Sequence, residues 1–144
     1  MTDDPQSPPP PEGFEPMPPR KGFQLHNGPF FQRLSEADPT MVEHALFILP
    51  RHVNGLGVLH GGMLSTFLDG VLGGAVVRVA AKPCVTVHLS VDFMRMARRG
   101  DWLRGEARVT RATRELVFSE GRALVGEHVV GRATGVFKLM GRRG

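Results

Sequence analysis

The spacing of apolar residues changes once along this chain, from a helical period to a strand period. Between Gly61 and Ala80, apolar side chains recur every three or four positions, which is typical of a helix that buries one face. Pro83 follows, as expected just beyond a helix end. From Val85 to Phe93, apolar and polar residues alternate, which predicts a half-buried strand. The positions that define the helix are Leu64, Leu68, Val71, Leu72, Ala75 and Val79.

The rest of the chain predicts short strands with short connections. Residues 23–31 indicate a loop or a short helix, and Pro50 ends the second strand. Because the connections between the last three predicted strands are short, we expect these strands to be antiparallel neighbours in the sheet. The prediction is an α+β domain in which one long central helix lies against an antiparallel sheet of five to six strands. Besides the alternating strand, the sheet should use residues 30–34, 41–49, 102–110, 116–124 and 128–139.

Composition divides the chain into a tail and one domain. Eight of the first 19 residues are proline, so residues 1–21 should be an extended or disordered tail that builds no core, and 22–144 the folded domain. We expect no membrane-spanning run, and the acidic start is unlike a signal peptide. The single cysteine, Cys84, excludes an internal disulfide, is expected to be a structural thiol and fits the reducing cytoplasm.

The net charge of +4 raises the question of an anionic partner. Tyrosine is absent and no aromatic and basic residues interleave, which argues against nucleic acid. One basic cluster, Arg95, Arg98 and Arg99, could receive the phosphates of a small anion or could be a solvated loop. The six histidines lack metal-ligand spacing, and no nucleophile elbow or phosphate-binding loop is present.

His60-Gly61-Gly62 stands where the helix must begin. The first helical N–H groups lack intrahelical partners, and glycine lets a ligand approach the backbone. These groups could therefore bind an anion or a developing oxyanion. The alternative is an ordinary glycine-rich turn. Because the preceding loop also directs Asn54 toward this end, we favour a site.

Asp69 interrupts the apolar run of the helix. The residues within about one turn are small, which leaves space beside the carboxylate for a substrate or for another chain: Ser65, Thr66, Gly70 and Gly73. The carboxylate could act as a general base, or could face water or an arginine. Gly61 and Asp69 are eight residues apart, about 12 Å along a helix, so they cannot serve one carbonyl within one chain. If both act, two subunits must share the site.

The stretch NGLGVLHGGMLSTFLD, residues 54–69, resembles the motif of hotdog-fold acyl-CoA thioesterases of the phenylacetic-acid-degradation (PaaI) type. The resemblance extends over about 22–140 and implies a long helix wrapped by an antiparallel sheet, homodimers and often dimers of dimers. It implies acyl-CoA as substrate, with no further cofactor and no nucleic-acid or membrane partner. The proline-rich tail lies outside the pattern.

The resemblance also implies roles for individual residues. The amide of Gly61 would polarise the thioester carbonyl, and Asp69 of the partner subunit would activate water or attack directly. Asn54 and His60 would orient the thioester. Gly62, Ser65, Arg98 and Arg99 are candidates for substrate binding. Thr86 occupies the position that helps to hold the water, although strict alternation places it on the polar face of its strand.

Two other functions stand as alternatives. A hotdog dehydratase or hydratase would rely on a catalytic histidine in a different motif. A non-catalytic acyl-CoA-binding module would bind without turnover, and as a sensor it would carry a DNA-binding domain that this tail cannot provide. Thioester hydrolysis, of aryl or medium-chain acyl-CoA, is the favoured expectation.

Overall fold

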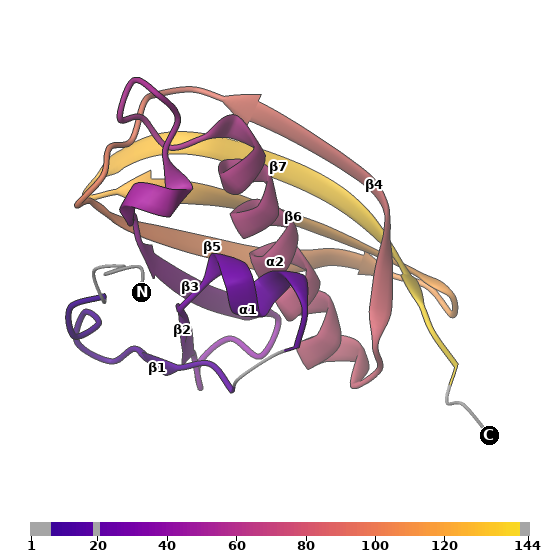
Figure 1. Cartoon of the computed structure of the whole chain (residues 1–144). Helices are drawn as coiled ribbons and strands as arrows, with labels where there is room; N and C mark the ends of the chain where they lie inside the picture. Colours follow the sequence, from indigo (N-terminus) through magenta and orange to yellow (C-terminus); the bar gives the residue numbers. More distant parts are fainter. Residues whose placement is uncertain (1–6, 19–20, 142–144) are drawn as a thin grey trace.

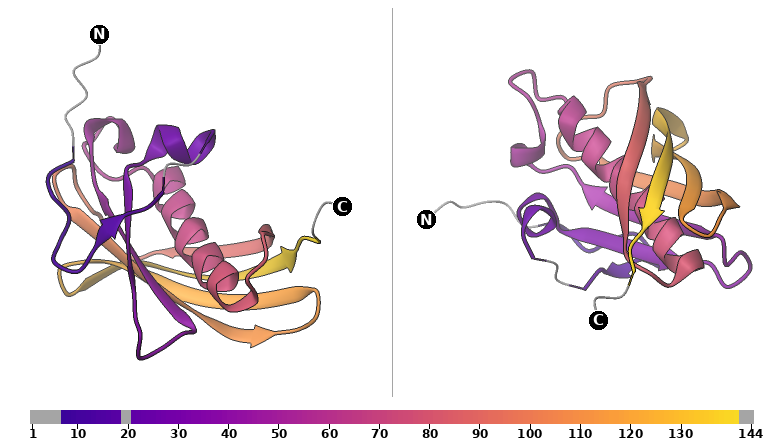
Figure 2. Two further views of the ribbon diagram at one scale, coloured as in Figure 1. Left: turned by 90° about the horizontal axis from the view of Figure 1, so that it is seen from below. Right: turned by 90° about the vertical axis from the view of Figure 1, so that its right-hand side faces the viewer.

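The computed structural model describes residues 7–18 and 21–141 as one helix-and-sheet unit. A long helix, α2, lies in the concave face of a curved sheet (Figure 1), and the short helix α1 lies on the same side of the sheet (Figure 2). The elements in chain order are β1 (Glu15–Pro16), α1 (Phe23–Asn27), β2 (Phe30–Leu34), β3 (Met41–Phe47), the 3-10 turn η1 (Pro50–His52), α2 (Gly61–Ala80), β4 (Cys84–Phe93), β5 (Trp102–Ala112), β6 (Leu116–Val125) and β7 (His128–Leu139).

The sheet has seven strands in the order β1-β2-β3-β5-β6-β7-β4, and every pair is antiparallel. The central helix and antiparallel sheet are confirmed, with one strand more than the expected five to six because β1 comes from the proline-rich segment. β5, β6 and β7 are neighbours, as predicted. β4 is not a neighbour of β5: it pairs with β7 and forms one edge of the sheet.

α2 supplies the centre of the core. Its bounds match the prediction, and five of the six predicted positions are buried, while Val79 is exposed. Close contact with the sheet depends on glycines, since a Cβ at Gly105 would lie 2.6 Å from the ring of Phe67. By length and composition α2 could span a membrane, contrary to expectation, but its apolar face packs on the sheet and forms the core of this domain.

A bulge in β4 changes which side chains face the helix. Thr86 pairs with Phe137 and His88 with Val136, so Val87 is an extra residue without a partner. Leu89 and Val91 pack on the core as predicted, but Val85 and Val87 are 47% and 59% exposed. The prediction that the whole apolar set covers the helix is therefore wrong for the first half of the strand, where Cys84 and Thr86 face α2 instead.

The described part of the proline-rich segment joins the sheet. Glu15 and Pro16 pair with β2, and the side chain of Phe14 is buried against Phe31 and Ala45. The expectation that this segment is extended holds for β1, but the expectation that it adds nothing to the core is wrong for Phe14. Packed structure thus begins before Gly22; residues 1–6 and 19–20 lie outside the described residues.

Arg78 ties the last turn of α2 to the β2–β3 turn. Its guanidinium donates to the backbone carbonyls of Met41 at 2.6 Å, Ser35 at 2.6 Å and Asp38 at 3.4 Å. A cation in the last turn also complements the helix dipole. This contact fixes the carboxyl end of α2 against the sheet.

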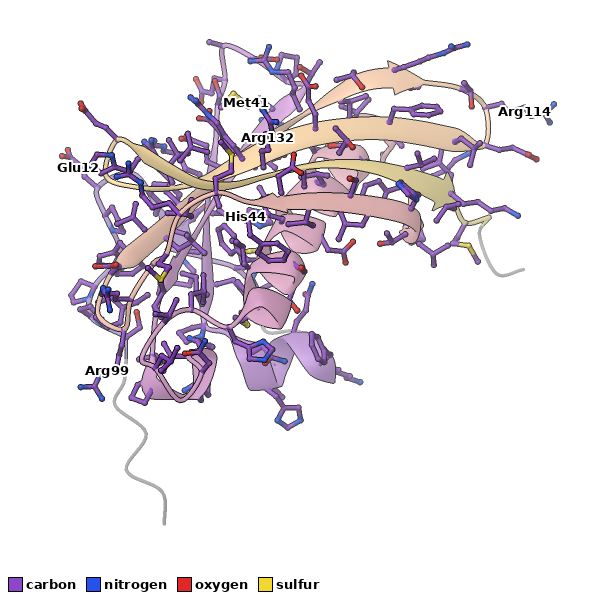
Figure 3. The ribbon with its side chains drawn as sticks, turned by 90° about the horizontal axis from the view of Figure 1, so that it is seen from above. Glu12, Met41, His44, Arg99, Arg114 and Arg132 are labelled. Carbon is purple, nitrogen blue, oxygen red and sulfur yellow. The ribbon has the colours of Figure 1, made fainter. Side chains whose placement is uncertain are left out.

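We predict that Arg78→Met lowers the free energy of unfolding by about 1–3 kcal/mol, because hydrogen bonds from a charged donor to three part-buried carbonyls are lost. Urea denaturation at one fixed protein concentration measures this. Arg114→Met is the matched control, because Arg114 is exposed at the tip of the β5–β6 hairpin (Figure 3). Equal stabilities of the two variants would contradict the role of Arg78.

Candidate active site

The amino end of α2 presents one free backbone donor. His60 is the N-cap residue, and its Nδ1 accepts a hydrogen bond from the N–H of Gly62 at 2.9 Å. The N–H groups of Met63 and Leu64 donate to the carbonyl of His60. Within the described residues, the N–H of Gly61 has no acceptor. Of the two candidate glycines, Gly61 can therefore donate to a ligand, whereas Gly62 is engaged by the cap.

Asn54 shapes the loop before this helix. Its Oδ1 accepts from the N–H groups of Leu56, at 2.9 Å, and Val58, at 3.2 Å, while its own N–H donates to the carbonyl of Val58. Leu59 then donates to the carbonyl of Ala97, which ties the loop to the segment after β4. Asn54 thus closes the loop through its oxygen, and its amide Nδ2 has no partner among the described residues.

Asp69 and Thr86 meet within one chain. The hydroxyl of Thr86 donates to Oδ1 of Asp69 at 2.6 Å, across the gap between α2 and β4. The bulge at Val87 makes this contact possible, because it turns Thr86 to the helix side while Leu89 and Val91 still reach the core. Oδ2 of Asp69 has no donor among the described residues, so it is the oxygen that a ligand or water could approach.

A cavity of about 250 Å³ opens beside Asp69 and Thr86. His44, from β3, and Cys84, from β4, also line it, and sequence reasoning did not assign them to the site. His44 lies between β3 and α2 (Figure 3), where a Cβ at Gly74 would be 3.0 Å from its Nε2. Alternation offered a signal for both residues, since His44 shares a face with buried Val42 and Leu46, and Cys84 shares one with Thr86.

A separate cavity, of about 510 Å³, lies at the amino end of α2. Gly61 lines it, and the aromatic ring of Phe93 lies so close that a Cβ at Gly61 would be 3.3 Å from Cε1. Its wall is largely apolar, with one cation, and includes Leu64, Met94, Arg95, Met96 and Val130. We call this the helix-start cavity.

The remaining candidates lie outside both cavities. Arg98 and Arg99 are exposed on the adjoining loop, where Arg98 bridges to Val58 and its N–H donates to Asp101. Arg99 stands at the opposite end of the molecule from Arg114 (Figure 3). Ser65 is half-buried on α2 and lines neither cavity. Of the basic cluster, only Arg95 reaches the helix-start cavity.

The free donor and the carboxylate are thus separated in one chain. Gly61 and Asp69 sit at the start and the middle of the same rigid helix, about 12 Å apart along its axis. They line two cavities that share no described residue. The free N–H of Gly61 and the carboxylate of Asp69 therefore belong to different cavities of the chain.

Comparison with known proteins agrees with this geometry. The sequence pattern of the family described as "Thioesterase superfamily" matches residues 56–132. The Pseudomonas aeruginosa protein "Putative esterase PA0474" is 40% identical over 131 residues, which cover 90% of this chain and 96% of that protein. The chain belongs to the thioesterase superfamily. It is a thioester hydrolase with the hotdog fold, which confirms the resemblance of residues 54–69 to the PaaI type.

Solved structures of similar fold include other thioesterases. A phenylacetic acid degradation-related protein of Ralstonia eutropha JMP134 is 27% identical with a TM-score of 0.69, over 75% of this chain and 83% of that one. A "Hypothetical Thioesterase Protein" from Streptococcus pneumoniae TIGR4, solved with coenzyme A, is 20% identical with a TM-score of 0.72, over 80% of this chain and 88% of that one. The second likeness shows the fold alone.

The environment of Cys84 provides a probe of the Asp69 cavity. Burial raises the pKa of the Cys84 thiol, and the negative charge of Asp69 raises this pKa further. Because iodoacetamide reacts with the thiolate, a raised pKa slows alkylation. We predict that Asp69→Asn, by removing the charge, speeds alkylation of Cys84 near neutral pH, as measured by intact-protein mass spectrometry.

Glu120→Gln is the control for that measurement, because Glu120 lies on β6 facing away from α2 and should leave the rate unchanged. An alkylation rate that is the same in Asp69→Asn as in the unmodified thioesterase would show that the carboxylate does not act on the thiol.

Proposed function

We propose that this thioesterase hydrolyses acyl-CoA thioesters with aryl or medium-chain acyl groups at a site shared by two subunits. The observation that carries the proposal is the division between the free N–H of Gly61 and the Thr86-bound carboxylate of Asp69, in separate cavities of one chain. Reacting groups must approach to about 3 Å. Only the glycine of one subunit and the aspartate of another can act on the same carbonyl.

The edge strand β4 supports a twofold dimer as the way to join the halves. β4 pairs with β7 on one side and ends the sheet on the other, which leaves a row of backbone donors and acceptors. Its exposed Val85 and Val87 offer apolar surface beside that row. Antiparallel pairing of two β4 strands would continue the sheet and bring each Asp69 cavity toward the partner. Pairing of two dimers into a tetramer, and a cytoplasmic location, belong to the same proposal.

In the proposed reaction, Asp69 acts as a general base. Thr86 holds Oδ1, and Oδ2 takes a proton from a water molecule as its oxygen attacks the thioester carbon. The carbonyl oxygen becomes an oxyanion, which accepts a hydrogen bond from the N–H of Gly61 at the positive end of α2. The tetrahedral intermediate then breaks its C–S bond. The thiolate of CoA takes the proton from Asp69, and the free acid departs.

The helix-start cavity suits the rest of the substrate. Its apolar wall can hold the chain that links the thioester to the nucleotide, and Arg95 adds a positive charge at its rim. Arg98 and Arg99 lie on the same loop but do not line the cavity. Their positive charges would attract the phosphates of CoA at long range. The coenzyme A in the Streptococcus pneumoniae structure supports this class of substrate.

We predict that Asp69→Asn lowers kcat by about 10²–10⁴, because the base is lost while the shape is kept. Gly61→Pro should lower kcat by about 10²–10³, because it removes the one free N–H at a helix position that accepts proline. Release of free thiol from phenylacetyl-CoA and octanoyl-CoA measures both effects.

Gly61→Ala is the matched control, since it adds a Cβ beside the exposed ring of Phe93 but keeps the N–H. We expect its kcat to stay within a few-fold of the original. Equal losses in Gly61→Ala and Gly61→Pro would mean that space, not the donor, matters at this position. Full turnover in Asp69→Asn would remove the carboxylate from the reaction.

A further inference from the structure

The proline-rich segment wraps around the β2 edge of the sheet. Phe14 is buried on the face away from α2, beside Phe31 and Trp102, and the guanidinium of Arg33 lies 4.5 Å from the centre of its ring. Arg33 also donates to the carbonyl of Glu12. We call residues 14–18 the strap, and these contacts anchor its first residue, Phe14, on the outer face.

Three residues beyond this anchor, the strap reaches the opposite face. The N–H of Met17 donates to the carbonyl of Phe30 at 3.0 Å, which extends the β1–β2 pairing by one bond. Met17 lines the Asp69 cavity together with Gln24 of α1. Since the backbone is held on both sides of β1, Met17 is a fixed part of the wall of that cavity.

A second cavity lies directly behind Met17. It has a volume of about 320 Å³ and shares three wall residues with the Asp69 cavity, namely Met17, Gln24 and Phe30. Apart from Gln24 and Arg51, its wall is made of apolar groups and glycine: Pro16, Met17, Pro18, Leu25, Gly28, Pro29 and Phe30. α1 forms one side and is held by His52, whose Nε2 donates to the carbonyl of Asn27 at 2.8 Å. We call this space the annex.

We propose that Met17 is the partition that limits acyl-chain length, a proposal that rests on the function proposed above. A cavity of about 150 Å³ holds a benzene ring. The 250 Å³ beside Asp69 therefore accommodates a phenylacetyl or medium-chain acyl group. A longer chain would have to pass Met17 into the annex. The substrate class is thus aryl and medium-chain acyl-CoA, and long chains are excluded by a side chain of the strap.

The test compares hydrolysis of octanoyl-CoA and tetradecanoyl-CoA. In Met17→Ala the partition is shortened and the annex becomes available to the extra methylene groups. We expect the ratio of kcat/KM for tetradecanoyl-CoA to that for octanoyl-CoA to rise at least about tenfold, because each methylene newly removed from water contributes to binding. Met17→Phe keeps a bulky side chain at the partition and should leave the ratio low.

Met41→Ala is the matched control, because Met41 lies with Arg132 on the face of the sheet away from α2 (Figure 3). A parallel measurement uses thioether analogues of the two substrates, which bind without turnover. In Met17→Ala the dissociation constant of the tetradecyl analogue should fall relative to that of the octyl analogue by a similar factor.

The outcomes separate the two proposals. If the original protein hydrolyses octanoyl-CoA but Met17→Ala leaves both ratios unchanged, the partition is wrong and the proposed function stands. If the original protein binds the analogues but hydrolyses neither ester, the proposed function is wrong, and the binding ratio still decides the role of Met17. If it binds no analogue and hydrolyses no ester, both proposals are wrong.

Discussion

The rigidity of α2 is the constraint on which this site depends. A helix advances about 1.5 Å per residue, so eight residues hold the free N–H of Gly61 and the carboxylate of Asp69 about 12 Å apart. The sheet prevents α2 from bending to reduce that separation, because its buried face packs along its length and Arg78 fixes its last turn. Under the proposed mechanism, one chain therefore holds two half-sites, and a complete site is assembled from two chains.

The bulge in β4 brings Thr86 to Asp69, which is the second half of the proposed site. A regular strand with Leu89 and Val91 in the core would point Thr86 to the outer face. The extra residue at Val87 shifts the first half of the strand by one position, so that Thr86 reaches Asp69 while the second half still packs on α2. The same shift exposes Val85 and Val87 at the sheet edge. The bulge thus has two effects: it places Thr86 beside Asp69, and it exposes apolar surface at the sheet edge that another subunit could contact.

The sequence predicted what local spacing determines. The bounds of α2 follow from periodicity, and its start at His60-Gly61-Gly62 follows from residue types that have local roles. The cap made by the side chain of His60 was not predicted. The place of β4 beside β7 depends on contacts distant in sequence, so the sequence alone did not predict it. The bulge at Val87 could not be predicted, because the sequence of β4 alternates between apolar and polar residues without interruption. Phe14 was missed because the prolines around it outweigh a single aromatic anchor.

The shared site is tested most directly by a heterodimer of Asp69→Asn and Gly61→Pro chains, isolated through two different affinity tags. In a twofold dimer, one site then combines the intact glycine of the first chain with the intact aspartate of the second, while the other site lacks both groups. The account predicts that the heterodimer recovers about half of the activity of the unmodified dimer, although each variant alone is nearly inactive. A heterodimer as inactive as its parents would contradict it.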